Sequence, residues 1–191
     1  MQPYKVSLTL PASADFHVFF SETSVQLIKT HLDKYYEGDY SVFYSECKLL
    51  MHELFTNAIN HSGSKEAEFE YIFTDNYFSI DMKTDGTGFT IKPVNPDSTP
   101  GEKRYTPPFT KLVGESFILH LDDDYEVVCN VVGEYELEFH NKERSSPLLD
   151  DMFSIPEHFG LFIITKLGFG VFYKKDETGK NIFSVKRKLP I

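Results

Sequence analysis

The sequence predicts an α+β fold in which helices and strands share one core. The first observation is an apolar stripe at helical spacing within residues 46–62. This stripe consists of Cys47, Leu50, Met51, Leu54 and Ala58. The second observation is that residues 68–73 and 77–83 alternate polar and apolar side chains, as half-buried strands do. A helix followed directly by two strands therefore forms the centre of the predicted fold.

Two further elements are predicted before this central unit. Residues 7–10 alternate as a strand that ends at Pro11. A helix follows, because apolar residues recur at helical spacing and Gly38 lies just past its expected end. Its stripe consists of Val25, Ile28, Leu32 and Tyr35. The central helix is then expected to run from about residue 41 to residue 62.

The second half of the chain begins with an irregular stretch. Residues 92–115 contain five prolines, which break any regular element there. A β-meander is expected next, as an added unit, and after it a short apolar helix and a closing hairpin. The meander strands are 117–121, 125–131 and 135–139, the helix is 159–167, and the hairpin strands are 170–173 and 182–186.

Length and composition favour one domain with an insertion. The chain has 191 residues, of which 41% are hydrophobic, including 18 Phe and 11 Tyr, and this suffices for a sizeable core. We expect a single domain over residues 1–191. Residues 92–155, which hold the proline-rich loop and the meander, form the insertion.

Charge and cysteine content exclude several classes of function. The net charge of -10 argues against binding to the phosphate backbone of DNA or RNA. The apolar run at residues 6–10 is too short for a signal peptide, and no run reaches the length of a membrane span. Cys47 and Cys129 stand alone, without metal-ligand spacing, and are expected to be reduced thiols. We therefore expect a cytoplasmic protein that binds neither nucleic acid nor membrane.

The central helix carries polar residues that its packing does not need. Glu53 and Asn57 are four residues apart, so they lie one helical turn from each other at the edge of the apolar stripe. A carboxylate and an amide at the rim of a core are placed to meet a ligand. The alternative is that both side chains lie on a solvated flank of the helix.

The sequence of the central helix and the order of the elements resemble a known superfamily. Residues 53–61 read Glu-Leu-Phe-Thr-Asn-Ala-Ile-Asn-His, and a Gly-x-Gly turn at Gly86 and Gly88 follows the second strand after the helix. This pattern resembles the histidine-kinase-like ATPases, and within them it is most similar to the bacterial anti-sigma-factor serine kinases. The resemblance implies a two-layer α+β sandwich, a mixed sheet covered on one face by helices, with the β-meander inserted.

The resemblance also implies a role for individual residues. Asn57 would bind Mg²⁺ through its amide oxygen, and Glu53 would orient the attacking hydroxyl or accept its proton. His61 would lie near the phosphates, although a histidine at a helix end is often only a surface residue. Gly86 and Gly88 would let the backbone approach the nucleotide. Gly160 would place backbone N–H groups near the phosphates at a helix N-terminus.

The chain departs from the superfamily pattern near the nucleotide base. Where relatives have an aspartate that binds the adenine amino group, this chain has Thr84, and the nearest carboxylate, Asp85, is shifted by one residue. Such a shift reverses the direction of a side chain in an extended segment. His158 replaces the first glycine of the second glycine motif, and the closing hairpin has Gly179-Lys180-Asn181 where relatives usually have Gly-Thr.

Two functions of different classes remain open at this stage. The first is an ATP-binding regulator of transcription that, with Mg²⁺, transfers the γ-phosphate of ATP to a serine of a partner protein. The resemblance implies a sigma factor or an anti-sigma antagonist as the partner, and a homodimer as the assembly. The second is an interaction module on the same fold that binds no nucleotide or has lost catalysis, and that uses residues 92–155 to hold its partner.

Overall fold

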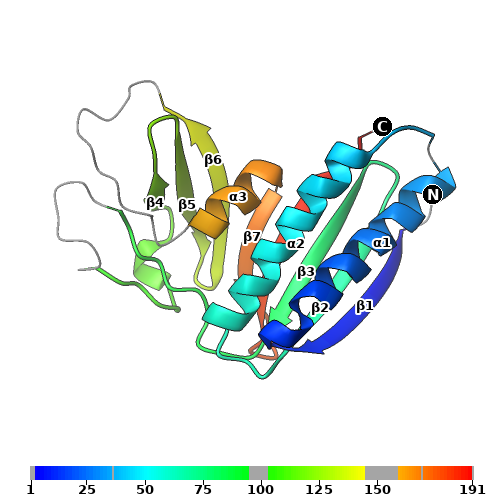
Figure 1. Cartoon of the computed structure of the whole chain (residues 1–191). Helices are drawn as coiled ribbons and strands as arrows, with labels where there is room; N and C mark the ends of the chain where they lie inside the picture. The colour runs from blue at the N-terminus through cyan, green and yellow to red at the C-terminus, as the bar shows by residue number, and fades with distance from the viewer. Residues whose placement is uncertain (1–2, 36, 95–102, 145–158, 169, 191) are drawn as a thin grey trace.

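A computed structural model describes residues 3–35, 37–94, 103–144, 159–168 and 170–190 (Figure 1). The strands are β1 (Tyr4–Pro11), β2 (Glu66–Phe73), β3 (Tyr77–Thr84), β4 (Ser116–Leu121), β5 (Tyr125–Gly133), β6 (Glu136–Glu143), β7 (Gly170–Lys175) and β8 (Asn181–Lys188). The α-helices are α1 (His17–Tyr35), α2 (Ser41–His61) and α3 (Phe159–Leu167). Short 3-10 helices lie at Ala14–Phe16 and Thr110–Leu112.

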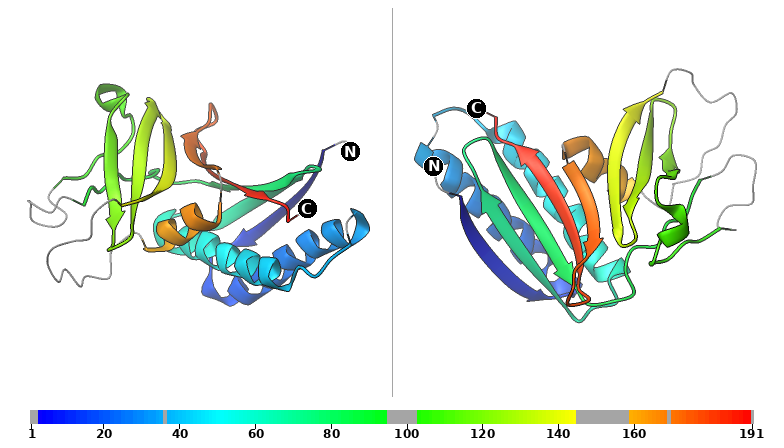
Figure 2. Two further views of the ribbon diagram at one scale, coloured as in Figure 1. Left: turned by 90° about the horizontal axis from the view of Figure 1, so that it is seen from above. Right: turned by 180° about the vertical axis from the view of Figure 1, so that it is seen from behind.

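The described strands form one eight-stranded sheet in the order β1-β2-β3-β8-β7-β6-β5-β4. Every pairing between these strands is antiparallel. Helices α1 and α2 lie against the half of the sheet that contains β1, β2 and β3, while α3 lies nearer to β5, β6 and β7 (Figures 1 and 2). The chain thus brings α2 and α3 side by side over the middle of the sheet.

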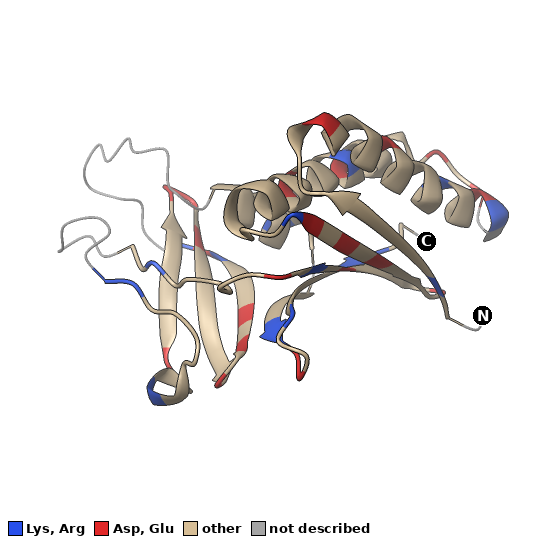
Figure 3. Ribbon diagram, turned by 90° about the horizontal axis from the view of Figure 1, so that it is seen from below, with Lys and Arg blue, Asp and Glu red and all other residues tan. Residues whose placement is uncertain are grey.

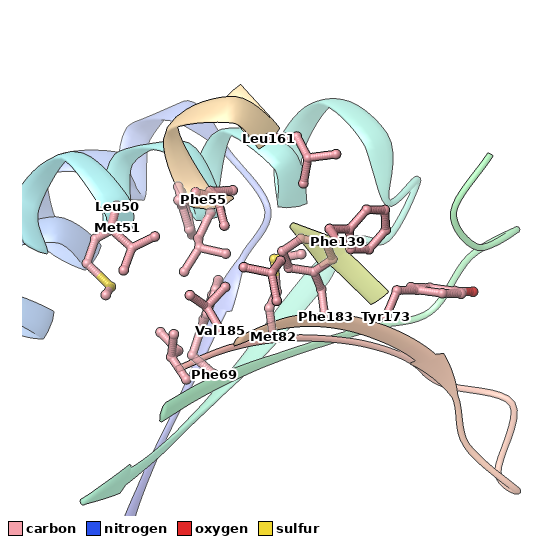
Figure 4. Packing of buried hydrophobic residues seen from close by; sticks show 14 of the residues in the cluster. Leu50, Met51, Phe55, Phe69, Met82, Phe139, Leu161, Tyr173, Phe183 and Val185 are labelled. Carbon is pink, nitrogen blue, oxygen red and sulfur yellow. The ribbon is translucent and has the colours of Figure 1, made fainter. Parts of the chain in front are cut away.

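Helix α2 forms because its apolar residues share one face that the sheet buries. The predicted stripe is confirmed, since Cys47, Leu50, Met51, Leu54 and Ala58 are all fully buried. Phe55 extends this face, and its ring stacks on Phe20 of α1 with 4.9 Å between the centroids. Phe20 in turn lies 4.2 Å from the ring of Phe69 in β2. Figure 4 shows Leu50, Met51 and Phe55 directed toward the sheet residue Phe69.

The other face of the β1–β3 region is charged. Acidic residues alternate along β2, visible as a red stripe in Figure 3. Lys5 of β1 lies 2.8 Å from Glu70, and Lys83 of β3 lies 3.3 Å from Glu70 and 3.4 Å from Glu68. These cross-strand pairs agree with the register of the three strands. One face of β2 therefore joins the core while the other carries ion pairs.

The predicted meander is part of the main sheet. Strand β6 pairs with β7, with Phe139 opposite Val171, so β4, β5 and β6 continue the sheet beyond the closing hairpin. Leu119, Val127 and Cys129 of this region are fully buried. His120 of β4 stacks on Phe162 of α3 at 4.9 Å between the ring centroids. The meander strands and α3 therefore belong to the same packed core.

The predicted fold class is wrong. A two-layer sandwich with a mixed sheet covered on one face by helices and an inserted β-meander was expected, as in the histidine-kinase-like ATPases. The described chain is instead mostly an eight-stranded antiparallel sheet, with three α-helices. The helix expected at residues 159–167 is confirmed as α3. The error concerns how the elements are assembled, since most of the individual helices and strands lie where they were expected.

The connections explain why the sheet is not mixed. Strands β2 and β3, β4 to β6, and β7 and β8 follow one another through tight turns, and such turns join antiparallel strands. Helices α1 and α2 run in opposite directions between β1 and β2, so the chain enters β2 in the direction opposite to β1. The mixed sheet was implied by the resemblance and not by these connections.

None of the described helices is both long enough and apolar enough to span a membrane.

Replacing Leu50 by alanine is expected to lower the free energy of unfolding by about 3 kcal/mol, because it leaves a cavity beneath α2. Leu49, its neighbour on the same helix, is the matched control, since its side chain is 44% exposed whereas Leu50 is 0% exposed. Leu49→Ala is expected to change the free energy by less than about 1 kcal/mol. Urea unfolding followed by circular dichroism measures both. Equal losses in the two variants would contradict the buried stripe.

Candidate functional site

Helix α2 presents its polar residues along the edge of the buried stripe. Glu53 and Asn57 are half-buried, while Leu54 and Ala58 beside them are fully buried. His61, one turn further, is exposed. The core thus holds the helix in a fixed orientation, and this orientation leaves Glu53 and Asn57 at the border of the core.

Helix α3 meets these two residues at its first turn. A Cβ atom added at Gly160 would lie 2.5 Å from Glu53 Oε2 and 3.8 Å from Asn57 Oδ1. Only a residue without a side chain fits at this position while Glu53 keeps its place. The structure therefore brings Glu53, Asn57 and Gly160 together, although more than 100 residues separate Gly160 from the other two.

The glycine turn after β3 packs between α2 and the closing hairpin. A Cβ atom at Gly86 would lie 1.9 Å from the carbonyl oxygen of Ser62, at the end of α2. Gly88 has a φ of 94°, and a Cβ atom there would lie 2.5 Å from Tyr173 Oη. The turn thus makes backbone contacts that a side chain would prevent.

A hydrogen-bonded chain of side chains holds this turn against the hairpin. Tyr173 Oη of β7 donates to Asn181 Oδ1 of β8 at 2.8 Å. Asn181 Nδ2 donates to the carbonyl oxygen of Gly86 at 3.1 Å. Burial raises the pKa of the Tyr173 hydroxyl, and the backbone N–H of Phe89 partly opposes this rise. The hydroxyl therefore keeps its proton and remains a donor to Asn181 at neutral pH.

These elements line a cavity of about 320 Å³, which we call the central cavity. Its lining residues come from α2, β3, the glycine turn, α3, β7 and β8. They are Glu53, Thr56, Asn57, His61, Ser62, Met82, Thr84, Thr87, Gly88, Phe89, Thr90, Lys92, Gly160, Leu161, Tyr173, Asn181 and Phe183. A volume of this size falls within the range of small-molecule sites.

Most of the predicted site residues line the central cavity. Glu53, Asn57, His61, Thr84, Gly88 and Gly160 all do so. Gly86 does not line it, but it accepts a hydrogen bond from Asn181, which does. Asp85 is exposed and lies outside the lining, so the structure does not bring its carboxylate to the cavity. The departure at His158 lies outside the described residues.

Two groups of polar residues and a set of apolar residues line the cavity. Glu53, Asn57 and Gly160 form the first group, since Gly160 approaches the other two closely. Thr84, Tyr173 and Asn181 form the second group, which carries hydroxyl and amide groups. Apolar side chains complete the lining, and Figure 4 shows Leu161 of α3 facing Met82 and Phe183 of the sheet.

The sequence did not lead us to expect Tyr173 in the site, and Asn181 was noted only as part of a departure from the superfamily pattern. Their meeting depends on the register of the closing hairpin, in which Tyr173 pairs with Phe183 and Lys175 pairs with Asn181. This register makes Tyr173 and Asn181 diagonal neighbours on one face of the sheet. The available signal was a polar residue at the start of β8, followed on the same face by the apolar residues Phe183 and Val185.

Comparisons with known proteins give no assignment. No protein-family model matches the chain, and no curated protein matches it either. Within the described part of the chain, no three His, Cys, Asp or Glu side chains are grouped so that they could hold a metal ion. A metal at the central cavity would therefore depend on oxygen atoms of a bound ligand as well as on the protein.

Replacing Gly88 by alanine is expected to lower the free energy of unfolding by about 1–3 kcal/mol more than the same change at Gly114, because of overpacking against Tyr173. Gly114 has a φ of 91°, close to that of Gly88, but an added Cβ there meets nothing within 4 Å. Both alanines carry the backbone strain of about 1–2 kcal/mol. Thermal and urea unfolding measure the stability of both variants, and the difference between them gives the cost of the steric contact with Tyr173.

Adding Tyr173→Phe to Gly88→Ala removes the nearest atom and is expected to restore part of the loss. Equal destabilisation at Gly88 and Gly114 would show that the turn does not pack against β7 as described.

Proposed function

We propose that the central cavity binds Mg²⁺-ATP and that the protein transfers the γ-phosphate to a serine of a partner protein. The observation that carries this proposal is the close approach of Gly160 to Glu53 and Asn57 in the lining of the central cavity. A carboxylate, an amide and the first turn of a helix meet there. The resemblance of residues 53–61 to the anti-sigma-factor serine kinases supports the same assignment.

The part of the cavity lined by Glu53 and Asn57 suits phosphate and metal. Amide and carboxylate oxygens are hard ligands of the kind that Mg²⁺ prefers, and Mg²⁺ keeps water and phosphate oxygens as its other ligands. Asn57 and Glu53 supply such oxygens. Helix α3 begins at Phe159, so its first backbone N–H groups, which lack partners within the helix, lie in this part. Lys92 adds a positive charge to the lining.

The apolar part of the lining suits a flat ring. Met82, Leu161 and Phe183 are each less than a tenth exposed and line the cavity from α3 and from the sheet. Burying a heteroaromatic ring between such side chains removes apolar surface from water, and this contributes binding free energy. A nucleotide with its base here and its phosphates near Asn57 uses both parts of the lining.

Glu53 has the role of orienting the attacking group. The serine hydroxyl of the partner attacks the γ-phosphorus, the bond from that phosphorus to the bridging oxygen of the β-phosphate breaks, and ADP leaves. The proton of the serine hydroxyl passes to the Glu53 carboxylate. Most of the acceleration in such reactions comes from positioning and charge neutralisation, to which Asn57 with Mg²⁺ contributes.

The partner and the setting follow from the resemblance. We propose a sigma factor or its antagonist as the partner, a cytoplasmic location and a homodimeric assembly. The net charge of -10 favours a partner with a basic contact surface.

A second candidate is an interaction module without nucleotide, and exposed apolar side chains near the β5–β6 turn favour it. Val113, Val132 and Tyr135 are 52%, 50% and 38% exposed. The segments that carry Val113 and Val132 are joined by a backbone hydrogen bond from Gly114 to Val131. Exposed apolar side chains that gather in one patch mark contact sites between proteins. This candidate predicts that titration with Mg²⁺-ATP releases no heat of binding.

Glu53→Gln is expected to retain Mg²⁺-ATP affinity within about threefold, while formation of ADP falls by about 100-fold or more, because the amide cannot accept the proton. Calorimetry measures the affinity. The rate of phosphate transfer is measured as the release of ADP in a single turnover, in which water attacks the γ-phosphate in place of the serine hydroxyl. Glu22→Gln on α1, which is exposed and outside the cavity, is the matched control and should leave both values unchanged.

Asn57→Ala is expected to weaken Mg²⁺-ATP binding by about tenfold or more. The loss of ATP affinity should be smaller when EDTA removes the Mg²⁺, because the amide acts through the metal. If wild-type protein shows neither a calorimetric signal nor a thermal shift with Mg²⁺-ATP, the proposed function is wrong.

A further inference from the structure

We infer that the packing of α3 on the sheet is a pH-sensitive switch: neutral His120 holds this helix in place, and acid releases it from the sheet and from the central cavity. The observation behind the inference is a buried histidine on β4 whose ring packs directly on α3. Release of the helix in acid does not depend on the proposed function. Its effect on nucleotide binding rests on that function.

The His120 ring lies in an apolar contact without hydrogen bonds. The residue is 1% exposed, and its ring stacks on Phe162 of α3 with 4.9 Å between the centroids and 22° between the planes. Phe159 of the same helix lies 6.2 Å from it. Within the described part of the chain, neither ring nitrogen makes a hydrogen bond. This environment favours the neutral imidazole, because a buried charge without polar partners is costly.

Asp122 offers a negative charge to the ring, but its own turn holds it in place. Asp122 Oδ2 lies 3.5 Å from His120 Nε2. Asp122 Oδ1 accepts hydrogen bonds from the backbone N–H groups of Asp124 and Tyr125 at 2.9 and 2.7 Å. The side chains of Asp123 and Asp124 are exposed. Burial lowers the pKa of His120, and Asp122 opposes this shift only in part.

Helix α3 brings a positive charge to the same contact. Lys166 Nζ lies 4.3 Å from the centre of the Tyr125 ring and 5.4 Å from that of Phe162. Phe162 is the ring on which His120 stacks. A proton on His120 would therefore place two cations beside one aromatic ring, and their repulsion adds to the cost of burial.

The end of β6 adds one charge of each sign. Arg144 donates a hydrogen bond from Nη1 to the carbonyl oxygen of Asp122 at 2.8 Å, so a second cation lies at this turn. Glu143 is exposed and pairs with Tyr125 across the strands. These groups leave the buried ring with Asp122 as its facing carboxylate among the described residues.

The direction of the pH effect follows from burial. When α3 is released, His120 is solvated and takes up a proton near its ordinary pKa of 6.5. When α3 is packed, the pKa of His120 is lower, so the packed state binds fewer protons. Packing is therefore fully stable above the ordinary pKa and loses stability as the pH falls below it. One proton changes this equilibrium by at most about tenfold per pH unit.

Helix α3 joins the His120 contact to the central cavity. It lies between α2 and the β4–β6 part of the sheet (Figure 1). Gly160 closely approaches Glu53, and Leu161 lines the cavity. The next residue, Phe162, meets His120. Release of α3 from the sheet therefore removes Gly160 and Leu161 from the cavity lining.

Hydrogen exchange of the full chain tests the release of α3. Mass spectrometry follows residues 159–167 at pH 7.5 and pH 5.5, corrected for the intrinsic pH dependence of exchange. Protection of this segment is expected to fall about three- to tenfold in the wild type, and less than about twofold in His120→Phe, which cannot take up a proton. His140→Phe, at an exposed histidine of β6, is the matched control and should behave like the wild type.

Two results overturn the inference. One is an unchanged protection of residues 159–167 in the wild type at pH 5.5. The other is an equal fall in the wild type and in a folded non-titrating variant. His120→Gln, which is smaller and also uncharged, serves as that variant if His120→Phe does not fold.

Asp122→Asn tests whether the proton resides on His120. The amide keeps an oxygen for the turn but removes the charge that favours protonated His120. The pH midpoint at which α3 loses protection is therefore expected to move to lower pH. An unchanged or higher midpoint contradicts the assignment to His120.

Calorimetric titration with Mg²⁺-ADP at pH 7.5 and pH 5.5 tests the connection to the central cavity. The wild type is expected to lose about threefold or more affinity in acid beyond the loss in His120→Phe, since other titrating groups are common to both. Equal losses, with α3 released as expected, overturn this connection. Absence of Mg²⁺-ADP binding at both pH values overturns the proposed function, whereas the exchange experiment still decides whether acid releases α3.

Discussion

Burial of the apolar face of α2 against the sheet is the interaction on which the rest of the structure depends. Phe55 joins this helix to Phe20 of α1 and to the sheet, and Leu50 and Leu54 are completely removed from water. Each such side chain contributes about 1.5–3 kcal/mol when fully buried. The same packing fixes the rotation of the helix, and so it determines that Glu53 and Asn57 lie at the border of the core.

Close backbone contacts at glycines then bring the other elements to α2. Gly160 allows α3 to approach Glu53, and Gly86 allows the turn after β3 to approach the end of α2 at Ser62. Gly88 leaves room for the Tyr173 hydroxyl, whose bond to Asn181 ties the turn to the closing hairpin. The central cavity is the space that remains between these contacts. Its lining therefore reflects which elements meet around it.

Much of the local structure could be predicted from the sequence, but the assembly could not. The stripe from Cys47 to Ala58 repeats at helical spacing, so α2 and its buried face were predictable from local periodicity. The prediction of a mixed sheet was wrong because strand order and direction depend on pairings between distant segments, such as β3 with β8 and β6 with β7. No residue pattern within one strand specifies its partner. The sheet continues through β4, β5 and β6 because their buried faces share the core with α3.

The sequence by itself determined that Glu53 and Asn57 lie one helical turn apart beside a buried stripe, since that relation follows from helix geometry alone. It also determined that a glycine turn follows β3 and that a glycine lies in the first turn of α3. Only the tertiary structure decided that Gly160 contacts Glu53, that Tyr173 and Asn181 meet on one face, and that Asp85 lies outside the cavity. These facts depend on hairpin register and on the packing of distant segments, which local sequence does not encode.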